Sequence, residues 1–163
     1  MGKTRITAAP SAPFIDMERE LDAPRELVLR AYLEPELVRQ WLGPRQYEMV
    51  IDQWDARAGG AYRYVQRDGA NQYGFHGVFH SMDMDSMVQT FEFEGAPGHV
   101  SLDRQVLEDL GDGRTRVKTH SVFQSVADRD AMIEAGMSEG VEDGYLRLDE
   151  LLARLRTPVG ASS

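Results

Sequence analysis

The strongest constraint on the fold is a change of hydrophobic period near residue 47. Over residues 22–44 apolar residues recur at helical spacing, whereas from residue 47 six segments alternate apolar and polar residues, as strands do. Short turns rich in Gly, Asp and Asn separate the segments, and they are too short for the crossovers of a parallel sheet. The sequence therefore predicts an antiparallel meander, with strands at residues 47–54, 61–66, 73–82, 87–94, 100–108 and 114–123.

One more strand and three helices flank this meander. Alternation over residues 14–21 predicts the first strand, and Asp22 is placed to cap a short helix that Pro35 ends. Residues 36–41 predict a second short helix. Apolar residues at spacings of three and four predict one long helix over residues 127–156. An antiparallel sheet with helices gathered on one face is an α+β architecture.

Composition limits the class of protein. The 163 residues are 42% hydrophobic and 28% charged, which fits one globular domain, expected at residues 13–156 between flexible tails at 1–12 and 157–163. The absence of Cys excludes disulfides, thiol catalysis and Cys-ligated metals. A net charge of −9 without a basic stripe argues against nucleic-acid binding. No signal peptide and no membrane span is recognisable, so a cytoplasmic location is expected.

Alternation also predicts which strand residues face the interior. The inward set is aromatic but includes hydroxyls, and Arg104 falls on the inward register between Leu102 and Val106. Polar groups on a concave aromatic face are typical of a ligand pocket, although tyrosine tips and Arg104 reaching solvent at a rim would give the same pattern. The residues expected to line the pocket are Trp41, Trp54, Tyr62, Tyr64, Phe75, Phe79, Phe91, Arg104, Thr119, Ser121, Met137, Val141 and Tyr145.

Three glycines stand out in the predicted long helix. Gly136, Gly140 and Gly144 follow one another at intervals of four residues and so share one helix face. Because glycine destabilises a helix interior, the spacing indicates that a strand or a ligand passes close to the helix backbone.

Catalytic and metal-binding patterns are not recognisable. His76 and His80 lie four apart on a predicted strand, which separates them by ~13 Å and prevents them from sharing a metal alone. No acid pair and no nucleophile with a partnered base stands out. The sequence therefore predicts no metal and no cofactor. Exposed edges of the sheet could pair, which leaves monomer and homodimer both open.

Four segments in order carry a family resemblance: DAPRELVLRAYLEPELVRQWLGP (22–44), AGGAYRYV (58–65), YGFHGVF (73–79) and GMSEGVEDGYLRLDELLARL (136–155). They resemble bacterial members of the activator of heat-shock-protein-90 ATPase homologue family, within the SRPBCC superfamily of START-like, birch-pollen-allergen-like proteins. The resemblance implies a helix-grip fold, in which a curved antiparallel sheet closes over an apolar cavity beneath a long C-terminal helix. Leu42 and Val141 depart from the pattern, since family members often have Trp at these positions.

Three functions follow as hypotheses. The first is binding of a small apolar or aromatic ligand between sheet and helix, oriented by Arg104 or a tyrosine hydroxyl. The second, implied by the family, is a stress-response module that binds a chaperone through the charged outer face. The third is a cyclase- or hydrolase-like enzyme in which Arg104 or Tyr64 polarises a carbonyl, although no base is identifiable.

Overall fold

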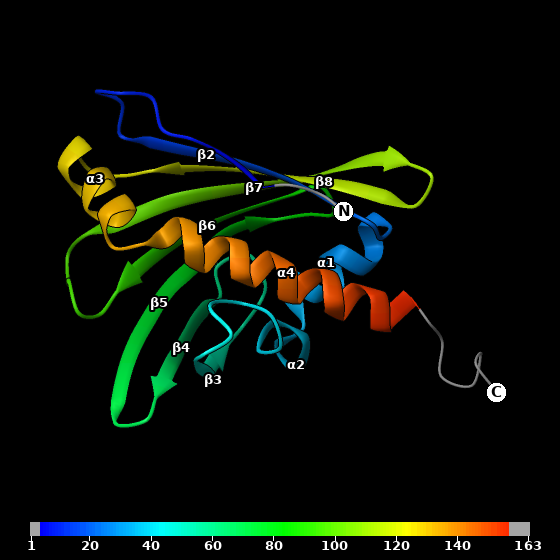
Figure 1. Ribbon diagram of the computed structural model, residues 1–163, viewed down its shortest axis with the longest axis horizontal. Helices are drawn as coiled ribbons and strands as arrows, with labels where there is room; N and C mark the ends of the chain where they lie inside the picture. Colours follow the sequence, from blue (N-terminus) through cyan, green and yellow to red (C-terminus); the bar gives the residue numbers. More distant parts are fainter. Residues whose placement is uncertain (1–3, 157–163) are drawn as a thin grey trace.

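The computed structural model describes residues 4–156 and contains one antiparallel sheet of eight strands (Figure 1). The strands are β1 (Arg5–Thr7), β2 (Phe14–Leu21), β3 (Glu48–Trp54), β4 (Ala61–Asp68), β5 (Asn71–Met82), β6 (Ser86–Phe93), β7 (Val100–Gly111) and β8 (Arg114–Val122). The helices are α1 (Arg25–Leu33), α2 (Pro35–Val38), α3 (Val126–Glu134) and α4 (Met137–Arg156). The meander and the α+β helix-grip fold are therefore confirmed, with strand ends within a few residues of those predicted.

The order of the strands explains how the sheet curves around a helix. It runs β1-β2-β8-β7-β6-β5-β4-β3, so the chain crosses the whole sheet once, through α1 and α2, between β2 and β3. In Figure 1, β2, β7 and β8 pass above α4, whereas β3 and β4 lie below it. Helices α1 and α2 lie beside the C-terminal half of α4. We refer to the face of the sheet that carries α4 as the concave face.

Two groups of buried side chains fill the interior. The first, which we name the α4 core, joins Leu148, Leu151 and Leu152 of α4 to residues of α1, β7 and β8. The second lies on β3, β4 and β5 and includes Tyr62, Tyr64 and Phe79. Burying this apolar area supplies most of the free energy of folding, and both groups lie on the concave face.

The N-terminal segment contributes a short strand to the sheet. Within the stretch 1–12 that the sequence analysis expected to be a flexible tail, Arg5–Thr7 forms an edge strand against β2, with Ile6 opposite Met17. Arg129 of α3 explains why, because its buried guanidinium donates hydrogen bonds to the carbonyls of Ala9 (2.8 Å) and Phe14 (3.3 Å). The other expected tail, residues 157–163, lies outside the described residues.

The long helix predicted over residues 127–156 is two helices. It breaks after Glu134, because Gly136 takes a φ of 86°, in the left-handed region that favours glycine. Ser125 caps α3, its hydroxyl accepting a hydrogen bond from the amide of Asp128 at 3.0 Å. The first helix also starts differently from the prediction. Its N-cap is Pro24 rather than Asp22, without a side-chain cap.

Candidate ligand-binding site

Strands β4, β5 and β6 place a row of stacked aromatic rings on the concave face. Alternation along β4 turns Tyr62 and Tyr64 inward, and the register sets Tyr64 opposite Phe75. Ring centroids are 6.2 Å apart for Tyr62–Tyr64, 5.2 Å for Tyr64–Phe75 and 5.5 Å for Phe75–Phe91. We name these four residues the aromatic ladder. The two tyrosines are buried, whereas Phe75 and Phe91 remain partly exposed.

Gly77 of β5 leaves room for the Tyr62 side chain to cross this strand. A Cβ at this position would overlap the carbonyl oxygen of Thr90 and lie 2.8 Å from the Tyr62 ring. Without it, the Tyr62 hydroxyl crosses β5 and donates a hydrogen bond to that carbonyl at 2.6 Å. The polar end of a buried tyrosine is therefore satisfied within the sheet.

Trp54 and Phe79 close one end of the ladder. Their ring centroids lie 5.6 Å apart, and that of Trp54 is 5.5 Å from Tyr62. The indole of Trp54 donates a hydrogen bond to the carbonyl of Leu33 at 2.7 Å, which ties the end of β3 to α1. Phe79 is buried and Trp54 is partly buried.

A line of polar side chains crosses the concave face beside the ladder, and Asp103 of β7 is its centre. The register places Gln89 of β6 opposite Asp103 on one side and Ser121 of β8 on the other. The Ser101 hydroxyl donates a hydrogen bond to the Asp103 carboxylate at 3.2 Å, and Ser121 also hydrogen-bonds to it. We name Gln89, Ser101, Asp103 and Ser121 the polar belt.

Burial dominates the electrostatics of this face. It raises the pKa of Asp103 from 3.8 to about 6, against the lowering effect of the two serine hydrogen bonds. Burial also raises the pKa of Tyr62 and of Tyr64 well above 10, and the negative charge of Asp103 adds to both shifts. Both tyrosines are therefore neutral near pH 7, and Asp103 is the group of this site that titrates nearest to neutrality.

Arg104 corrects the predicted register of β7. Its side chain is exposed and faces away from the ladder, because Leu107 lies opposite Val117 in the α4 core and turns the odd-numbered residues inward. Leu102, expected inside, is 46% exposed. Arg104 therefore cannot orient a ligand on the concave face or polarise a carbonyl there, which removes one support of the enzyme hypothesis.

Trp41 and Tyr145 are buried as expected but belong to the α4 core. Their rings stack with centroids 6.4 Å apart, and the indole of Trp41 donates to the carbonyl of Ala31 at 2.9 Å. Tyr145 hydrogen-bonds to Tyr32 and to Thr119, an inward residue of β8. These contacts give Trp41, Thr119 and Tyr145 structural partners of their own.

The remaining expected residues lie where the sequence placed them, on inward or partly covered positions. Ser121 is buried in the polar belt. Met137 and Val141 are partly buried on the first turns of α4, and Val141 packs against the α4 core. The sequence analysis missed Asp103 and Gln89 as site residues. A correct register for β7 would have identified Asp103, because a carboxylate on an inward position is a distinctive signal.

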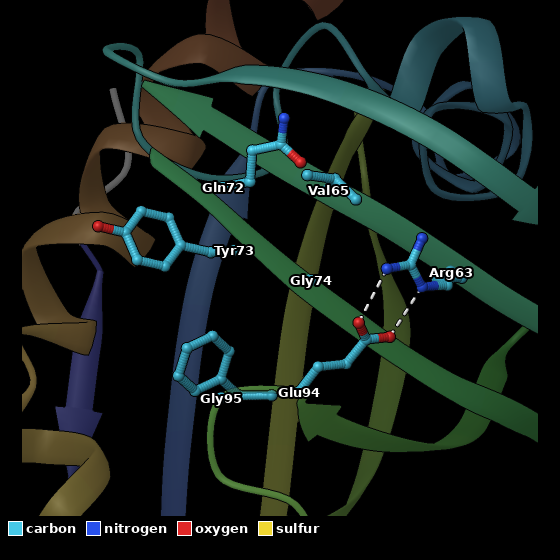
Figure 2. A pocket seen from close by; sticks show the side chains of 8 residues that line it. Arg63, Val65, Gln72, Tyr73, Gly74, Glu94 and Gly95 are labelled. Carbon is cyan, nitrogen blue, oxygen red and sulfur yellow. Dashed lines mark hydrogen bonds and ion pairs between the residues drawn. The ribbon is translucent and has the colours of Figure 1, made fainter. Parts of the chain in front are cut away.

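A surface hollow of about 480 Å³ lies at the ends of β4, β5 and β6 (Figure 2). Figure 2 shows the Arg63 and Glu94 side chains meeting over β5 beside Gly74, with Tyr73 further along the strand. The Arg63 guanidinium binds both carboxylate oxygens of Glu94, at 2.8 Å each, across Gly74. A Cβ on Gly74 would overlap Glu94, so glycine is needed where this ion pair crosses the strand. A second hollow, of about 540 Å³, adjoins it at the turn after β4.

Among residues 4–156, no three His, Asp or Glu side chains gather in a way that could hold a metal ion. Over the same residues, no helix combines the length and hydropathy that crossing a bilayer requires.

Comparisons with known proteins place this chain in a family. The profile of the family described as "Activator of Hsp90 ATPase homolog 1-like protein" matches residues 22–153. The chain belongs to this family, whose helix-grip fold fits a ligand-binding or co-chaperone-like module. No functionally curated protein matches the sequence.

Solved structures agree on the fold. A crystal structure from Rhodobacter sphaeroides has a TM-score of 0.85 at 22% identity, covering 93% of this chain and 99% of that one. A solution structure from Arthrobacter aurescens has a TM-score of 0.84 at 23% identity, with coverages of 96% and 94%. CalU16 from Micromonospora echinospora has a TM-score of 0.61 at 19% identity, with coverages of 93% and 85%. At these identities the likeness concerns the fold alone.

Proposed function

We propose that this chain binds a small hydrophobic or aromatic ligand on the concave face, between the aromatic ladder and α4. The observation that carries the proposal is the incomplete burial of Phe75, which stacks on the buried Tyr64, and of Phe91, which stacks on Phe75, on the face that a helix-grip domain turns inward. Flat aromatic surface left partly open beside a polar group is typical of a ligand pocket.

The packing of the interior limits where such a ligand lies. The α4 core is filled by buried side chains, with Trp41 and Tyr145 among them. The ladder is therefore the part of the concave face that offers apolar contact area, and the polar belt next to it supplies the groups that fix orientation. Covering an aromatic ring gains free energy through both area burial and ring stacking.

A thermal-shift screen against fatty acids, flavonoids, polyketides and aromatic acids tests the proposal. A ligand at 100 times its dissociation constant stabilises the folded state by about 2.7 kcal/mol, which raises the unfolding midpoint by several degrees. Phe91→Leu keeps an apolar side chain but removes the stacking surface, so it weakens binding. Phe14→Leu, a matched change of an exposed aromatic on the other face, and Arg104→Ala leave it unchanged. A screen without hits, or hits equally weakened by all three variants, contradicts the proposal.

A second candidate function, binding to a chaperone, is favoured by the outer face of the sheet. The register aligns Leu102 with Val122 and Val122 with Phe14, and Val78 joins them through Thr90, whose hydroxyl accepts a hydrogen bond from the Val78 amide at 2.9 Å. Leu102 and Val78 are each 46% exposed, and Phe14 is 38% exposed. A row of exposed apolar side chains on an otherwise charged face fits a protein interface, and the family's name implies a chaperone of the Hsp90 type. We place this role in the cytoplasm, within a stress response.

Co-purification tests this second candidate. Leu102→Glu is expected to abolish capture of an Hsp90-type chaperone and any change in its ATPase rate, whereas Val50→Glu, at an exposed position on edge strand β3, preserves both. Failure of the unchanged protein to bind the chaperone rules this function out.

A further inference from the structure

We infer that the ligand of the concave face is an aromatic or apolar amine whose positive charge pairs with Asp103. The inference rests on the proposed function and names the class of molecule that this site accepts. It is carried by the position of Asp103 in the polar belt, beside the aromatic ladder, and by the absence of a basic partner for its carboxylate.

The neighbours of Asp103 are neutral. Gln89 and Ser121 lie opposite it on the adjacent strands, Ser101 donates a hydrogen bond to it, and its charge acts on the hydroxyls of Tyr62 and Tyr64. Within residues 4–156, no Arg, Lys or His forms an ion pair with Asp103. A partly buried carboxylate without a counter-charge is costly, and a cationic ligand would reduce that cost.

The buried arginines on the inner side of the domain are already occupied by other groups. Arg19 pairs with Glu142 and Asp149 of α4, and Arg129 with Asp130 and the N-terminal segment. Neither guanidinium is therefore available to Asp103. The nearest arginine in sequence, Arg104, points to the outer face.

A second acceptor without a partner lies next to the belt. Gln105 follows Asp103 on the same face of β7, and its side-chain oxygen is buried without a hydrogen-bond partner among the described residues. An ammonium group supplies several donors and no acceptor, so it can serve this oxygen as well as the Asp103 carboxylate. A carboxylate ligand, by contrast, would bring a second negative charge next to Asp103.

Two further features favour a cation. Aromatic faces attract ammonium groups, so the ladder contributes to binding both the ring and the charge of such a ligand. The net charge of −9 raises the local concentration of cations around the molecule and lowers that of anions.

The same arrangement makes binding pH-dependent. Asp103, with its pKa raised to about 6, is ionised at pH 7.5 and mostly protonated at pH 5, so affinity for an amine falls as the pH is lowered. Among the other titratable groups that face this region, Tyr62 and Tyr64 of β4 and Tyr145 of α4 stay neutral because burial raises each pKa. Burial also raises the pKa of Asp149 of α4, but this carboxylate pairs with Arg19 rather than with the polar belt, so loss of the pH dependence in Asp103→Asn assigns it to Asp103.

Three ligands with one ring system test the inference: 1-naphthylmethylamine, 1-naphthylmethanol and 1-naphthoic acid. Calorimetry at pH 7.5 should show the amine binding about tenfold more tightly than the alcohol, which corresponds to one charged hydrogen bond, and the acid most weakly. Lowering the pH to 5 should weaken amine binding roughly tenfold, because only about one tenth of Asp103 is then still ionised. Binding of the alcohol should not change.

Two variants test whether Asp103 causes the preference for the amine and its pH dependence. Asp103→Asn keeps the shape of the side chain and should abolish both the preference for the amine and its pH dependence. Asp109→Asn, an exposed carboxylate on the same strand, should change neither. If Asp103→Asn does not fold, the pH series on the unchanged protein decides the question.

The possible outcomes separate the two proposals. Equal affinity for amine and alcohol, or a preference that survives Asp103→Asn, overturns the inference but leaves ligand binding by the ladder intact. Failure of all three naphthyl compounds to bind overturns the amine inference and counts against the ladder as a binding site as well.

Discussion

Arg19 of β2 and Asp149 of α4 form an ion pair that connects the sheet to the helix across the interior. The Arg19 side chain is fully buried, and that of Asp149 is 12% exposed. The same guanidinium lies 3.2 Å from a carboxylate oxygen of Glu142 and 5.5 Å from the centroid of the Tyr145 ring. Three residues of α4 therefore share one arginine, which sets the position of the helix along β2.

Arg19→Met is expected to destabilise the protein by about 3–5 kcal/mol, because it leaves the largely buried Asp149 without its counter-charge. Urea unfolding at pH 7 measures the change. Arg30→Met provides the control, since the Arg30–Glu34 pair is exposed on α1 and its loss costs only about 0.3–0.5 kcal/mol.

The double variant Arg19→Met/Asp149→Leu tests whether the loss comes from the unpaired charge. Because an apolar pair of similar volume replaces the ion pair, most of the lost stability should return. An equally small effect for Arg19→Met and Arg30→Met would show that the ion pair does not hold α4 in place.

Asp103→Asn is expected to increase stability at pH 7.5. Burial raises the pKa of Asp103 from 3.8 to about 6, so the stability it contributes is fully present below pH 4 and is lost as the pH rises through 6. A shift of this size corresponds to at most about 3 kcal/mol at pH 7.5. Thermal unfolding from pH 4 to 8 measures it. The variant should match the unchanged protein at pH 4 and exceed it at pH 7.5, whereas a constant difference would exclude titration of Asp103 as the cause.

Glu94→Gln should have the opposite pH dependence. Hydrogen bonds from Arg63 and His76 lower the pKa of Glu94 from 4.5 to about 2, so its contribution to stability is present above pH 4.5 and is lost as the pH falls toward 2. The variant is therefore less stable than the unchanged protein at pH 7 and equal to it near pH 2. Acid unfolding followed by circular dichroism shows this, with Glu48→Gln as the control at a more exposed ion pair with Arg67. A deficit of Glu94→Gln that persisted at pH 2 would contradict this explanation.

The alternation of β4, β5 and β6 was sufficient to predict that the ladder residues face inward, because the aromatic residues of each strand fall on one register only. Strand β7 was different, since Leu102 and Val106 are apolar on one register and Leu107 on the other. Pairing with β8 decides between them by placing Leu107 in the α4 core. This single ambiguity explains why Arg104 was wrongly predicted to face inward and why Asp103 was missed as a site residue.

Contacts between elements distant in sequence were beyond prediction for a different reason. Alternation puts Arg19 on the same side of β2 as Ile15 and Leu21, but its partners on α4 lie more than a hundred residues further along the chain. The helix break at Gly136 was also hidden, because the apolar stripe of α3 continues in phase with that of α4, so periodicity alone indicates one helix.

The three evenly spaced glycines turn out to have three different environments, which gives a last prediction. Gly136 has a φ of 86° between α3 and α4, whereas Gly140 and Gly144 lie inside α4. A Cβ on Gly140 would meet only Pro44, at 3.5 Å, an ordinary contact. A Cβ on Gly144 would lie 3.3 Å from the carbonyl oxygen of Trp41, so the close neighbour is the segment after α2, neither a strand nor a ligand.

Alanine at each position should therefore act differently on stability. Gly140→Ala should stabilise by about 0.5–1 kcal/mol, because alanine is the better helix former and the space is free. Gly136→Ala should destabilise by about 1 kcal/mol or more, because alanine is strained at a positive φ. The stability of Gly144→Ala should be lower than that of Gly140→Ala, because the new Cβ requires the Trp41 backbone to shift. Urea unfolding of the three variants side by side measures this order, and a stabilising Gly136→Ala would mean that α3 and α4 join into one helix without strain.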